Sequence, residues 1–176
     1  MRKVTFGGAN SLDNFLARAD GGMDWLLWDD EVSAVIAEFW AKIDTVVMGR
    51  KTYEFAAKSS GGGGENPYPG VKSYVCSRTM AAIPADNVEV VGDAVELLRQ
   101  LKEESGKDIC IMGGGELGAS LLNADLIDEL GVNIHPVLLG TGVPLFPGLS
   151  RQVDLELIDS KVFKTGCVAL TYRVKH

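Results

Sequence analysis

The stretch Asp108-Ile109-Cys110-Ile111-Met112-Gly113-Gly114-Gly115-Glu116-Leu117 decides the fold of this chain. Its apolar first half is long enough for one buried strand, and it ends in three consecutive glycines before a segment with helical character. A strand, a glycine turn and a helix in this order let backbone N–H groups at the helix N-terminus meet a phosphate. A Cβ in the turn would hold that phosphate off the backbone. Taken alone, the turn is equally compatible with a tight connection that binds nothing.

Strand and helix patterns alternate along the rest of the chain. Apolar residues recur at helical spacing from residue 29 to residue 43, and Asp29 and Asp30 suit the N-cap and the first turn. Other helices are predicted at 51–58, 94–104 and 116–123. Strands are predicted at 4–9, 45–48, 72–76, 88–91, 108–112 and within 126–135, with a turn at 10–14 and a Gly/Pro-rich loop at 139–149.

Two further segments complete the predicted architecture. The Gly/Ser-rich residues 59–67 are expected to form a mobile surface loop within one domain, because neither side of them closes a sheet alone. Residues 153–174 predict a hairpin that turns around Lys164-Thr165-Gly166. We therefore expect a single α/β domain over residues 1–176, with three α/β/α layers around a mixed, mostly parallel central sheet that carries a C-terminal antiparallel hairpin.

The composition narrows the classes of function. With 46% hydrophobic and 23% charged residues, the chain has the balance of a soluble globular protein. A formal net charge of −7 argues against broad nucleic-acid binding, although it leaves room for a small anion site. No segment is apolar for long enough to span a membrane, so we expect a cytoplasmic location. Cys76, Cys110 and Cys167 lack the spacing of a zinc site and are expected to be reduced core thiols, with a catalytic cysteine as the weaker alternative.

Three segments place glycine or small polar residues where predicted strands end. In doubly wound sheets, ligands bind beyond the carboxyl ends of the strands. One segment joins Gly49 to the basic pair Arg50 and Lys51, whose charge at a helix start would be compensated by a bound anion. Another, residues 77–79, sets two hydroxyls beside a guanidinium, which suits a phosphate. The third is the glycine turn. Each has a structural alternative, a solvated basic pair or a plain turn, but together they predict an anionic ligand.

The order of these motifs resembles the dihydrofolate reductase superfamily. The resemblance is closest to the branch that contains the reductase (C-terminal) domain of the bifunctional bacterial riboflavin-biosynthesis deaminase-reductase and its stand-alone relatives. It covers nearly the whole chain. The motifs that carry it are Ser11-Leu12-Asp13, Met48-Gly49-Arg50-Lys51-Thr52-Tyr53-Glu54, Ser77-Arg78-Thr79, Met112-Gly113-Gly114-Gly115-Glu116-Leu117 and His135-Pro136-Val137-Leu138-Leu139-Gly140-Thr141-Gly142-Val143-Pro144-Leu145-Phe146.

The resemblance implies that NADPH is the hydride donor. By position, it implies that the cofactor phosphates are held by Gly49, Arg50, Lys51 and Thr52, and that the pyrophosphate runs along Gly113, Gly114, Gly115, Glu116 and Leu117. It further implies that Ser77, Arg78 and Thr79 meet the adenosine end, with Arg78 as the partner of the 2′-phosphate. The implied substrate is a small pyrimidine or pteridine, similar to 5-amino-6-(5-phosphoribosylamino)uracil, bound with the help of Ser11, Asp13, Trp25 and Tyr53.

The catalytic acid is the open point of the sequence. In dihydrofolate reductases a carboxylate on the first helix supports protonation of the substrate. Counting back from Met48 reaches Ser33, whereas counting from Trp25 reaches Asp30, so Asp24, Asp30 and Glu31 all stay candidates. Asp24 and Asp30 are our first choices, with helix capping as the alternative role for Asp30.

Four further residues could have a structural or a functional role. Asn14 stands where the family often has glycine, and asparagine tolerates the left-handed backbone that this turn needs. Trp25 and Trp28 could stack on a heteroaromatic ring, but tryptophan is by default a core residue. His135 precedes a proline at a strand end and is expected to have a structural role.

Several expectations follow about activity and partners. The first is an NADPH-dependent oxidoreductase acting on a small molecule, without a metal, nucleic acid or membrane partner. The alternatives are dihydrofolate reductase-like activity, a non-catalytic NADP(H)-binding protein of the same fold, and an interaction domain that binds no dinucleotide. The resemblance also implies a homodimer, for which the C-terminal strands offer a free edge.

Overall fold

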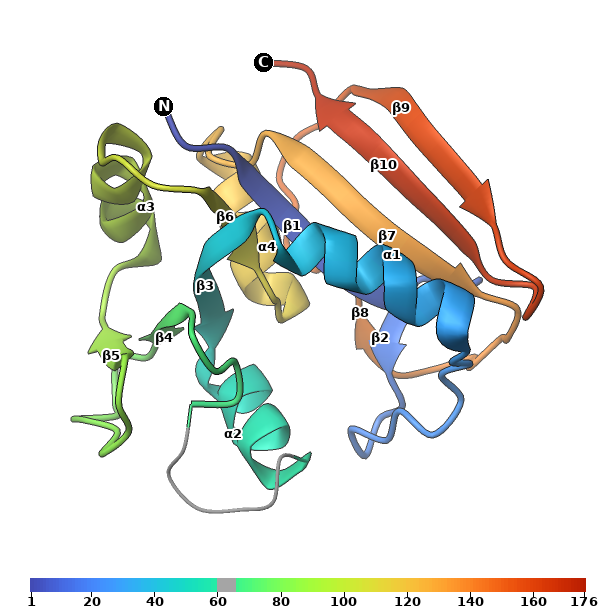
Figure 1. Ribbon diagram of the computed structural model, residues 1–176, viewed down its shortest axis with the longest axis horizontal. Helices are drawn as coiled ribbons and strands as arrows, with labels where there is room; N and C mark the ends of the chain where they lie inside the picture. Colours follow the sequence, from blue (N-terminus) through green and yellow to red (C-terminus); the bar gives the residue numbers. More distant parts are fainter. Residues whose placement is uncertain (60–65) are drawn as a thin grey trace.

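The computed structural model describes residues 1–59 and 66–176, and within them eight strands form one sheet (Figure 1). The strand order across the sheet is β5-β4-β3-β6-β1-β7-β10-β9, so the N-terminal strand lies near its middle. The strands are β1 (Val4–Ser11), β3 (Ile43–Gly49), β4 (Lys72–Cys76), β5 (Val88–Val91), β6 (Asp108–Ile111), β7 (Glu129–His135), β9 (Leu155–Val162) and β10 (Val168–Val174).

The sheet is mixed and mostly parallel, as predicted. β5, β4, β3, β6, β1 and β7 pair in parallel, whereas β10 runs antiparallel to both β7 and β9. The last two strands are the predicted C-terminal hairpin. Since all six parallel strands point the same way, their carboxyl ends lie along one edge of the molecule, which is where the motifs of the sequence were expected to meet.

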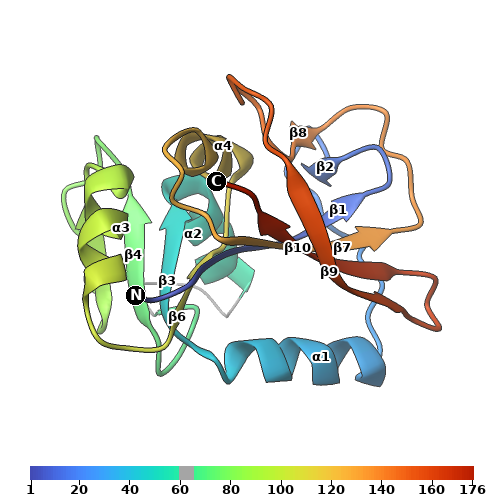
Figure 2. The same cartoon turned by 90° about the horizontal axis from the view of Figure 1, so that it is seen from above.

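Helices cover both faces of the sheet, which confirms the three predicted layers. α1 (Asp30–Trp40) and α2 (Arg50–Ser59) pack on one face, where Phe39 and Tyr53 join a core with Met48 of β3. α3 (Ala94–Glu103) and α4 (Gly115–Asn123) pack on the other, where Leu98 and Leu121 join a core with β1. Figure 2 shows α1 and α4 on opposite sides of the sheet.

The helix starts follow the capping signals of the sequence. The Asp29 carboxylate accepts a hydrogen bond from the Val32 N–H at 2.8 Å, and Asp93 caps α3 in the same way through Val95 and Glu96. Each cap satisfies donors that the first turn of a helix leaves free. Asp29 is therefore the N-cap of α1, and Asp30 is its first helical residue.

Several element boundaries differ from the sequence-based prediction. β1 continues through Asn10 and Ser11, which were predicted to be a turn, because β7 is long enough to pair with it up to Ser11 opposite His135. α1 ends at Trp40 because Ile43 already belongs to β3. α4 begins one residue early, at Gly115. Residues 60–65 of the predicted surface loop lie outside the described residues.

A second, two-stranded sheet was not predicted. It pairs β2 (Phe15–Ala17) with β8 (Val143–Pro144), and it joins the segment after β1 to the Gly/Pro-rich loop. Both strands are too short to leave a periodic pattern. Gly142 allows the segment before β8 to approach β2 closely, since a Cβ there would lie 2.2 Å from the carbonyl oxygen of Ala17.

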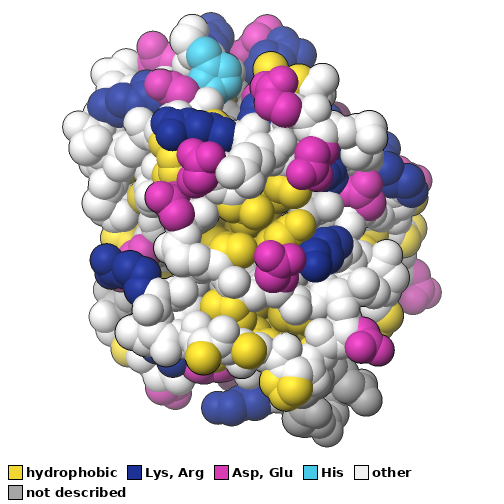
Figure 3. All heavy atoms as spheres, turned by 90° about the vertical axis from the view of Figure 1, so that its left-hand side faces the viewer, with side chains coloured by type: hydrophobic (Ala, Val, Ile, Leu, Met, Phe, Trp, Pro, Cys, Tyr) yellow, Lys and Arg dark blue, Asp and Glu magenta, His cyan; other side chains and the backbone are white. Residues whose placement is uncertain are grey.

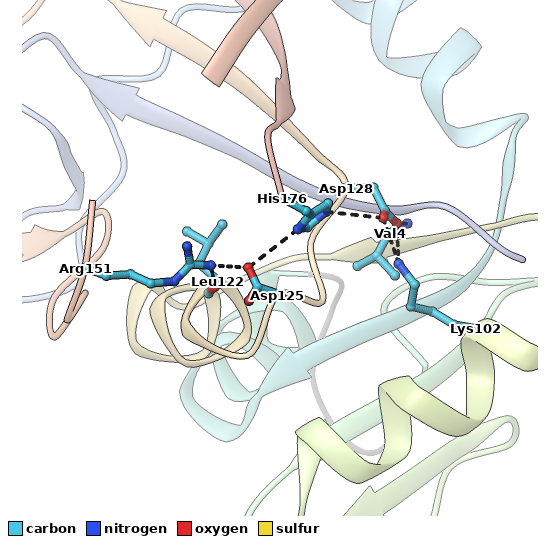
Figure 4. Close-up of polar contacts among 7 residues, drawn as sticks. All are labelled: Val4, Lys102, Leu122, Asp125, Asp128, Arg151 and His176. Atoms are coloured by element: carbon cyan, nitrogen blue, oxygen red, sulfur yellow. Dashed lines mark hydrogen bonds and ion pairs between the residues drawn. The ribbon is translucent and has the colours of Figure 1, made fainter. Parts of the chain in front are cut away.

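Charged residues connect several elements at the amino ends of the parallel strands (Figure 4). The Asp128 carboxylate accepts hydrogen bonds from the Lys102 ammonium at 2.6 and 2.8 Å and from the Val4 N–H at 2.7 Å. Asp128 thereby connects α3, β1 and the segment before β7. Its neighbour Asp125 forms a more exposed ion pair with Arg151, and His176 lies 3.5 Å from the same carboxylate.

Candidate functional site

The three glycine- or hydroxyl-bearing segments follow three adjacent strands. β4, β3 and β6 are neighbours in the sheet, and their carboxyl ends lead into residues 77–79, 49–52 and 113–117. The Gly49 N–H donates a 2.8 Å hydrogen bond to the Gly113 carbonyl oxygen, so two of the segments touch directly. The motifs therefore follow neighbouring strand ends, and their role in holding a ligand stays a prediction.

The glycine turn leaves space for an added Cβ at Gly113 and at Gly114, although Gly113 itself is buried. Gly113 has a φ of 91°, a left-handed value that disfavours other residues, and a Cβ added there would meet no atom within 4 Å among the described residues. A Cβ on Gly114 would meet only the Thr52 hydroxyl oxygen, at 3.8 Å. The peptide bond between the two glycines is cis. The turn thus presents bare backbone next to the start of α2.

The N-terminus of α4 adds unpaired donors to this turn. Its N-cap residue is Gly114, which has no side chain to accept from the first-turn N–H groups. Those N–H groups and the positive end of the helix dipole favour an anion. Glu116 lies in the same turn with an exposed side chain, so its only favourable contribution toward a phosphate is its backbone N–H.

Basic side chains border the site on the β3 and β4 sides. The Arg50 guanidinium forms an ion pair with Glu54 one helical turn later, at 2.8 Å, and both remain partly exposed. Arg78 is exposed in the turn after β4, where the Ser77 hydroxyl oxygen accepts from the N–H groups of Thr79 (3.3 Å) and Met80 (3.0 Å). The Ser77 side chain thus fixes the turn that carries Arg78.

The second sheet closes the site on the β1 side. Gly115 packs so tightly against it that a Cβ would lie 2.4 Å from the carbonyl oxygens of Pro144 and Leu145. Between these segments lies a cleft of about 460 Å³ lined by Asp13, Asn14, Phe15, Pro144, Leu145 and Phe146. Two of its lining residues, Pro144 and Leu145, are the ones whose carbonyl oxygens pack against Gly115.

Ser11 and Asp13 shape the wall of this cleft. The Ser11 hydroxyl oxygen accepts from the Phe15 N–H at 2.9 Å, and the Asp13 carboxylate accepts from the N–H groups of Leu139 and Gly140, the latter at 2.7 Å. The hydrogen bond from Ser11 and these two N–H groups lower the pKa of Asp13. Both side chains thus hold the loop, and their predicted contacts with substrate stay predictions. Asn14 has a φ of 64°, which confirms the expected left-handed turn.

Trp25 and Tyr53, the other two predicted substrate contacts, are buried. Tyr53 packs in the core under α2, and burial raises its pKa. The Trp25 ring packs edge-on against His135 with centroids 5.4 Å apart, and its indole N–H is buried without a partner among the described residues. Their substrate contacts stay predictions, while their packing gives both a structural role.

His135 has the structural role that was predicted for it. Its Nδ1 accepts from the Leu27 N–H at 3.1 Å and lies 3.2 Å from the Cys167 sulfur. Burial lowers the pKa of the ring, which favours the neutral form. The imidazole therefore fastens the segment that carries Trp25 to the ends of β7 and β10.

None of the three candidate acids is among the residues that line the cleft. The Asp24 side chain is 74% exposed and pairs with Arg18 at 3.1 Å. Asp30 is exposed in the first turn of α1, and Glu31 forms an ion pair with Lys161 of β9 at 3.4 Å. The carboxylate that does line the cleft is that of Asp13, which sequence reasoning assigned to substrate binding.

The three cysteines are buried or half-buried. Cys76, Cys110 and Cys167 are free, as expected, and burial raises the pKa of Cys76 and of Cys110 to about 12. No cluster of three or more His, Cys, Asp or Glu side chains within residues 1–59 and 66–176 could hold a metal ion. In those same ranges, no helix is long and apolar enough to cross a membrane.

Known proteins are similar to this chain in sequence and in fold. The uncharacterized protein YyaP of Bacillus subtilis is 30% identical over 97% of this chain and 94% of its own length. The crystal structure of a protein assigned to riboflavin biosynthesis from Shewanella sp. PV-4 covers 100% of both chains with a TM-score of 0.85 and 29% identity. A dihydrofolate reductase from Enterococcus faecalis, solved with NADP(H), covers 99% of this chain and 97% of its own, with a TM-score of 0.72 and 18% identity.

The sheet order and the glycine-rich strand ends define an α/β protein with a dihydrofolate-reductase-like fold. Within that class, the chain belongs to the RibD C-terminal domain family, whose sequence profile matches residues 2–169. The family resemblance drawn from the motifs is thereby confirmed.

Proposed function

We propose that this protein is an NADPH-dependent reductase of a small heterocyclic molecule. The observation that carries the proposal is that three segments with hydrogen-bond donors follow the carboxyl ends of three neighbouring strands, in the order β4, β3, β6. Bare backbone at Gly113 and Gly114 and the uncapped start of α4 suit a pyrophosphate. When bound, NADPH supplies the hydride, and the protein supplies binding, orientation and exclusion of water.

The proposed path of the cofactor follows these strand ends. Its adenosine end lies over residues 77–79, where Arg78 is free to meet the 2′-phosphate. Its phosphates lie between the start of α2, with Arg50, Lys51 and Thr52, and the glycine turn. The nicotinamide reaches the cleft beside the second sheet, which is next to Gly115.

The proposed substrate is a pyrimidine or pteridine with a reducible carbon, related to 5-amino-6-(5-phosphoribosylamino)uracil. Exposed apolar side chains lie after the end of β1, before α1 and after the end of β7, and they suit the ring faces of such a molecule. These side chains are Leu12, Leu27, Trp28 and Leu138. A cytoplasmic location is proposed with this activity, because NADPH and its small-molecule substrates are found there.

The direct test is a titration with NADPH followed by a turnover assay. NADPH is expected to bind in the micromolar range, on the order of common enzyme affinities for small molecules. Oxidation is then followed by the loss of its absorbance with 5-amino-6-ribosylaminouracil derivatives and with dihydrofolate, in parallel reactions. Failure to bind any dinucleotide would contradict the proposal and favour an interaction domain. Activity with dihydrofolate alone would favour a dihydrofolate reductase.

The Arg78→Ala variant tests the adenosine end of the cofactor path. Loss of a charge-assisted contact to the 2′-phosphate is expected to weaken NADPH binding by about 10-fold or more, with little effect on NADH. Both affinities are measured by fluorescence titration. Arg99→Ala is the matched control, because Arg99 is an exposed arginine on α3 and is expected to leave both affinities unchanged. Equal losses for NADPH and NADH would remove Arg78 from this role.

A non-catalytic NADP(H)-binding protein is the second candidate. It is favoured by the position of Asp24, Asp30 and Glu31, whose side chains are exposed or paired outside the cleft. Tight binding of NADPH without oxidation across the substrate panel would select this candidate over the reductase.

A further inference from the structure

His135 lies in surroundings that are unusual for an ionisable side chain. Figure 3 shows Lys, Arg, Asp and Glu side chains spread over the surface on the side of the molecule that carries α3 and β5. His135, in contrast, is only 2% exposed. It has no carboxylate partner within residues 1–59 and 66–176, whereas the other histidine of the chain, His176, lies 3.5 Å from Asp125. An imidazolium at the position of His135 would be desolvated without a counter-charge, so the neutral ring is favoured.

The neutral ring holds the backbone of a neighbouring segment through its Nδ1 atom. Nδ1 accepts a hydrogen bond from the Leu27 N–H at 3.1 Å, which requires the ring proton to be on Nε2. The Cys167 sulfur lies 3.2 Å from the same nitrogen, and the Trp25 ring packs edge-on against the imidazole. Protonation would make both ring nitrogens donors, so that two N–H groups would face each other. The hydrogen bond from Leu27 therefore exists only while His135 is neutral.

Residues 18–28, between β2 and α1, have few other polar contacts. Within the part of the chain that the structure describes, all their remaining hydrogen bonds and ion pairs join residues of the segment to each other. These pairs are Arg18–Gly22, Arg18–Gly21, Asp20–Gly22, Arg18–Asp24 and Met23–Leu26. Among the described residues, the hydrogen bond from Leu27 to His135 is thus the one polar connection between this segment and the rest of the protein.

We propose that His135 is a pH-sensitive latch, a side chain that holds residues 18–28 while its ring is neutral and releases them when the ring is protonated. The segment carries Leu27 and Trp28, whose exposed side chains the proposed function places against the substrate. Release would therefore change the border of the substrate site, and this consequence rests on the proposed function. The release itself rests only on the contacts of His135.

Other titratable groups near His135 do not supply this response. Cys167 is the titratable group in direct contact with the ring. The charged groups on the elements packed around His135 are partly or fully exposed, and none of them forms an ion pair with it among the described residues. They are Asp13 after β1, Arg18 and Asp24 in the segment, Asp29 and Glu31 at the start of α1, and Lys161 and Lys164 of the β9–β10 hairpin. Histidine is the side chain that ordinarily changes charge between about pH 5 and pH 8.

The direction of the pH effect follows from the burial of the ring. Burial lowers the pKa of His135 from the ordinary histidine value of about 6.5. In the released state the ring meets water and regains the ordinary value. The released state therefore takes up a proton as the pH falls below about 6.5, while the held state does not, and one proton shifts the equilibrium by about tenfold per pH unit. The held state is favoured above this pH and is lost progressively below it, until the pH reaches the lowered pKa.

Hydrogen exchange of the Leu27 N–H gives the first test. After correction for the intrinsic exchange rate, its protection in the wild type is expected to fall by about tenfold between pH 7.5 and pH 5.5. In His135→Asn an amide oxygen can accept near the position of Nδ1 without titrating, so the protection of Leu27 should no longer depend on pH in this range. His176→Asn is the matched control, because it removes the other histidine and is expected to keep the wild-type pH dependence.

His135→Phe gives the second test, because it keeps an aromatic ring beside Trp25 but has no acceptor for Leu27. Its Leu27 N–H is expected to be as weakly protected at the higher pH as the wild type is at the lower pH. Equal wild-type protection at both pH values, or a wild-type pH dependence in His135→Asn, would overturn the latch. So would loss of the pH dependence in His176→Asn, or full protection of Leu27 in His135→Phe. NADPH titrations on the same samples report separately on the proposed function.

Discussion

The Gly115→Ala variant is expected to lose about 3 kcal/mol or more of the free energy of unfolding, at the upper end of what overpacking costs. The new Cβ would lie 2.4 Å from two backbone carbonyl oxygens, those of Pro144 and Leu145, so α4 or the second sheet has to move. Helix propensity alone predicts the opposite sign, since alanine is favoured over glycine by about 1 kcal/mol. Urea denaturation monitored by circular dichroism gives the answer.

Gly114→Ala is the matched control for this expectation. A Cβ at Gly114 meets only the Thr52 hydroxyl oxygen, at 3.8 Å, and its φ of −70° suits alanine. Its denaturation midpoint is expected to stay near that of the wild type, while its added Cβ projects into the turn proposed to hold the pyrophosphate and weakens NADPH. If the two variants have the same denaturation midpoint, Gly115 does not pack as closely against the second sheet as described.

The Asp128→Ala variant is expected to lose about 2 kcal/mol of the free energy of unfolding. The change removes the acceptor of a backbone N–H and leaves the Lys102 ammonium, whose side chain is only 11% exposed, without its partner. The midpoint of urea denaturation should fall with little change in its slope.

Asp125→Asn is the control for Asp128, because both aspartates belong to the cluster of Figure 4 and asparagine tolerates the left-handed φ of 56° at this position. The Asp125 side chain is 56% exposed, and its ion pair with Arg151 is open to water on both sides. Exposed ion pairs contribute little, so the loss is expected to stay below about 1 kcal/mol. A larger loss for Asp125→Asn than for Asp128→Ala would contradict the assignment of Asp128 as the residue that connects β1 and α3.

Local patterns in the sequence were sufficient for the helices, for the strands of the central sheet and for the motif positions, but not for β2 and β8. The apolar run before Gly113, the β-branched run before Gly49 and the cap at Asp29 each depend on neighbouring residues only. The sheet order depends on pairing between distant segments, and no local pattern encodes that β6 lies between β3 and β1. The hairpin was predictable because its two strands are joined by a short turn.

The substrate side was the least predictable part. Whether Asp13 contacts a ligand or the 139–140 backbone is decided by a loop that lies 126 residues away in the sequence. Likewise, Trp25 packs against His135 and Tyr53 packs in the core, although neither has a local signal that separates burial from binding. The three candidate acids could be named from spacing, but their distance from the cleft depends on how α1 crosses the sheet.

The central position of β1 also affects how the chain is made. Val4 and Phe6, which are fully buried, belong to β1, which is translated before every other strand of this sheet. The strands that flank it, β6 and β7, are translated only after residues 108 and 129. The apolar strand β1 therefore stays without its partner strands until β6 and β7 have been made. A chain that stops before residue 135 lacks part of β7, which pairs with β1 up to Ser11. Such long-range pairing predicts slow folding and a need for protection by chaperones during translation.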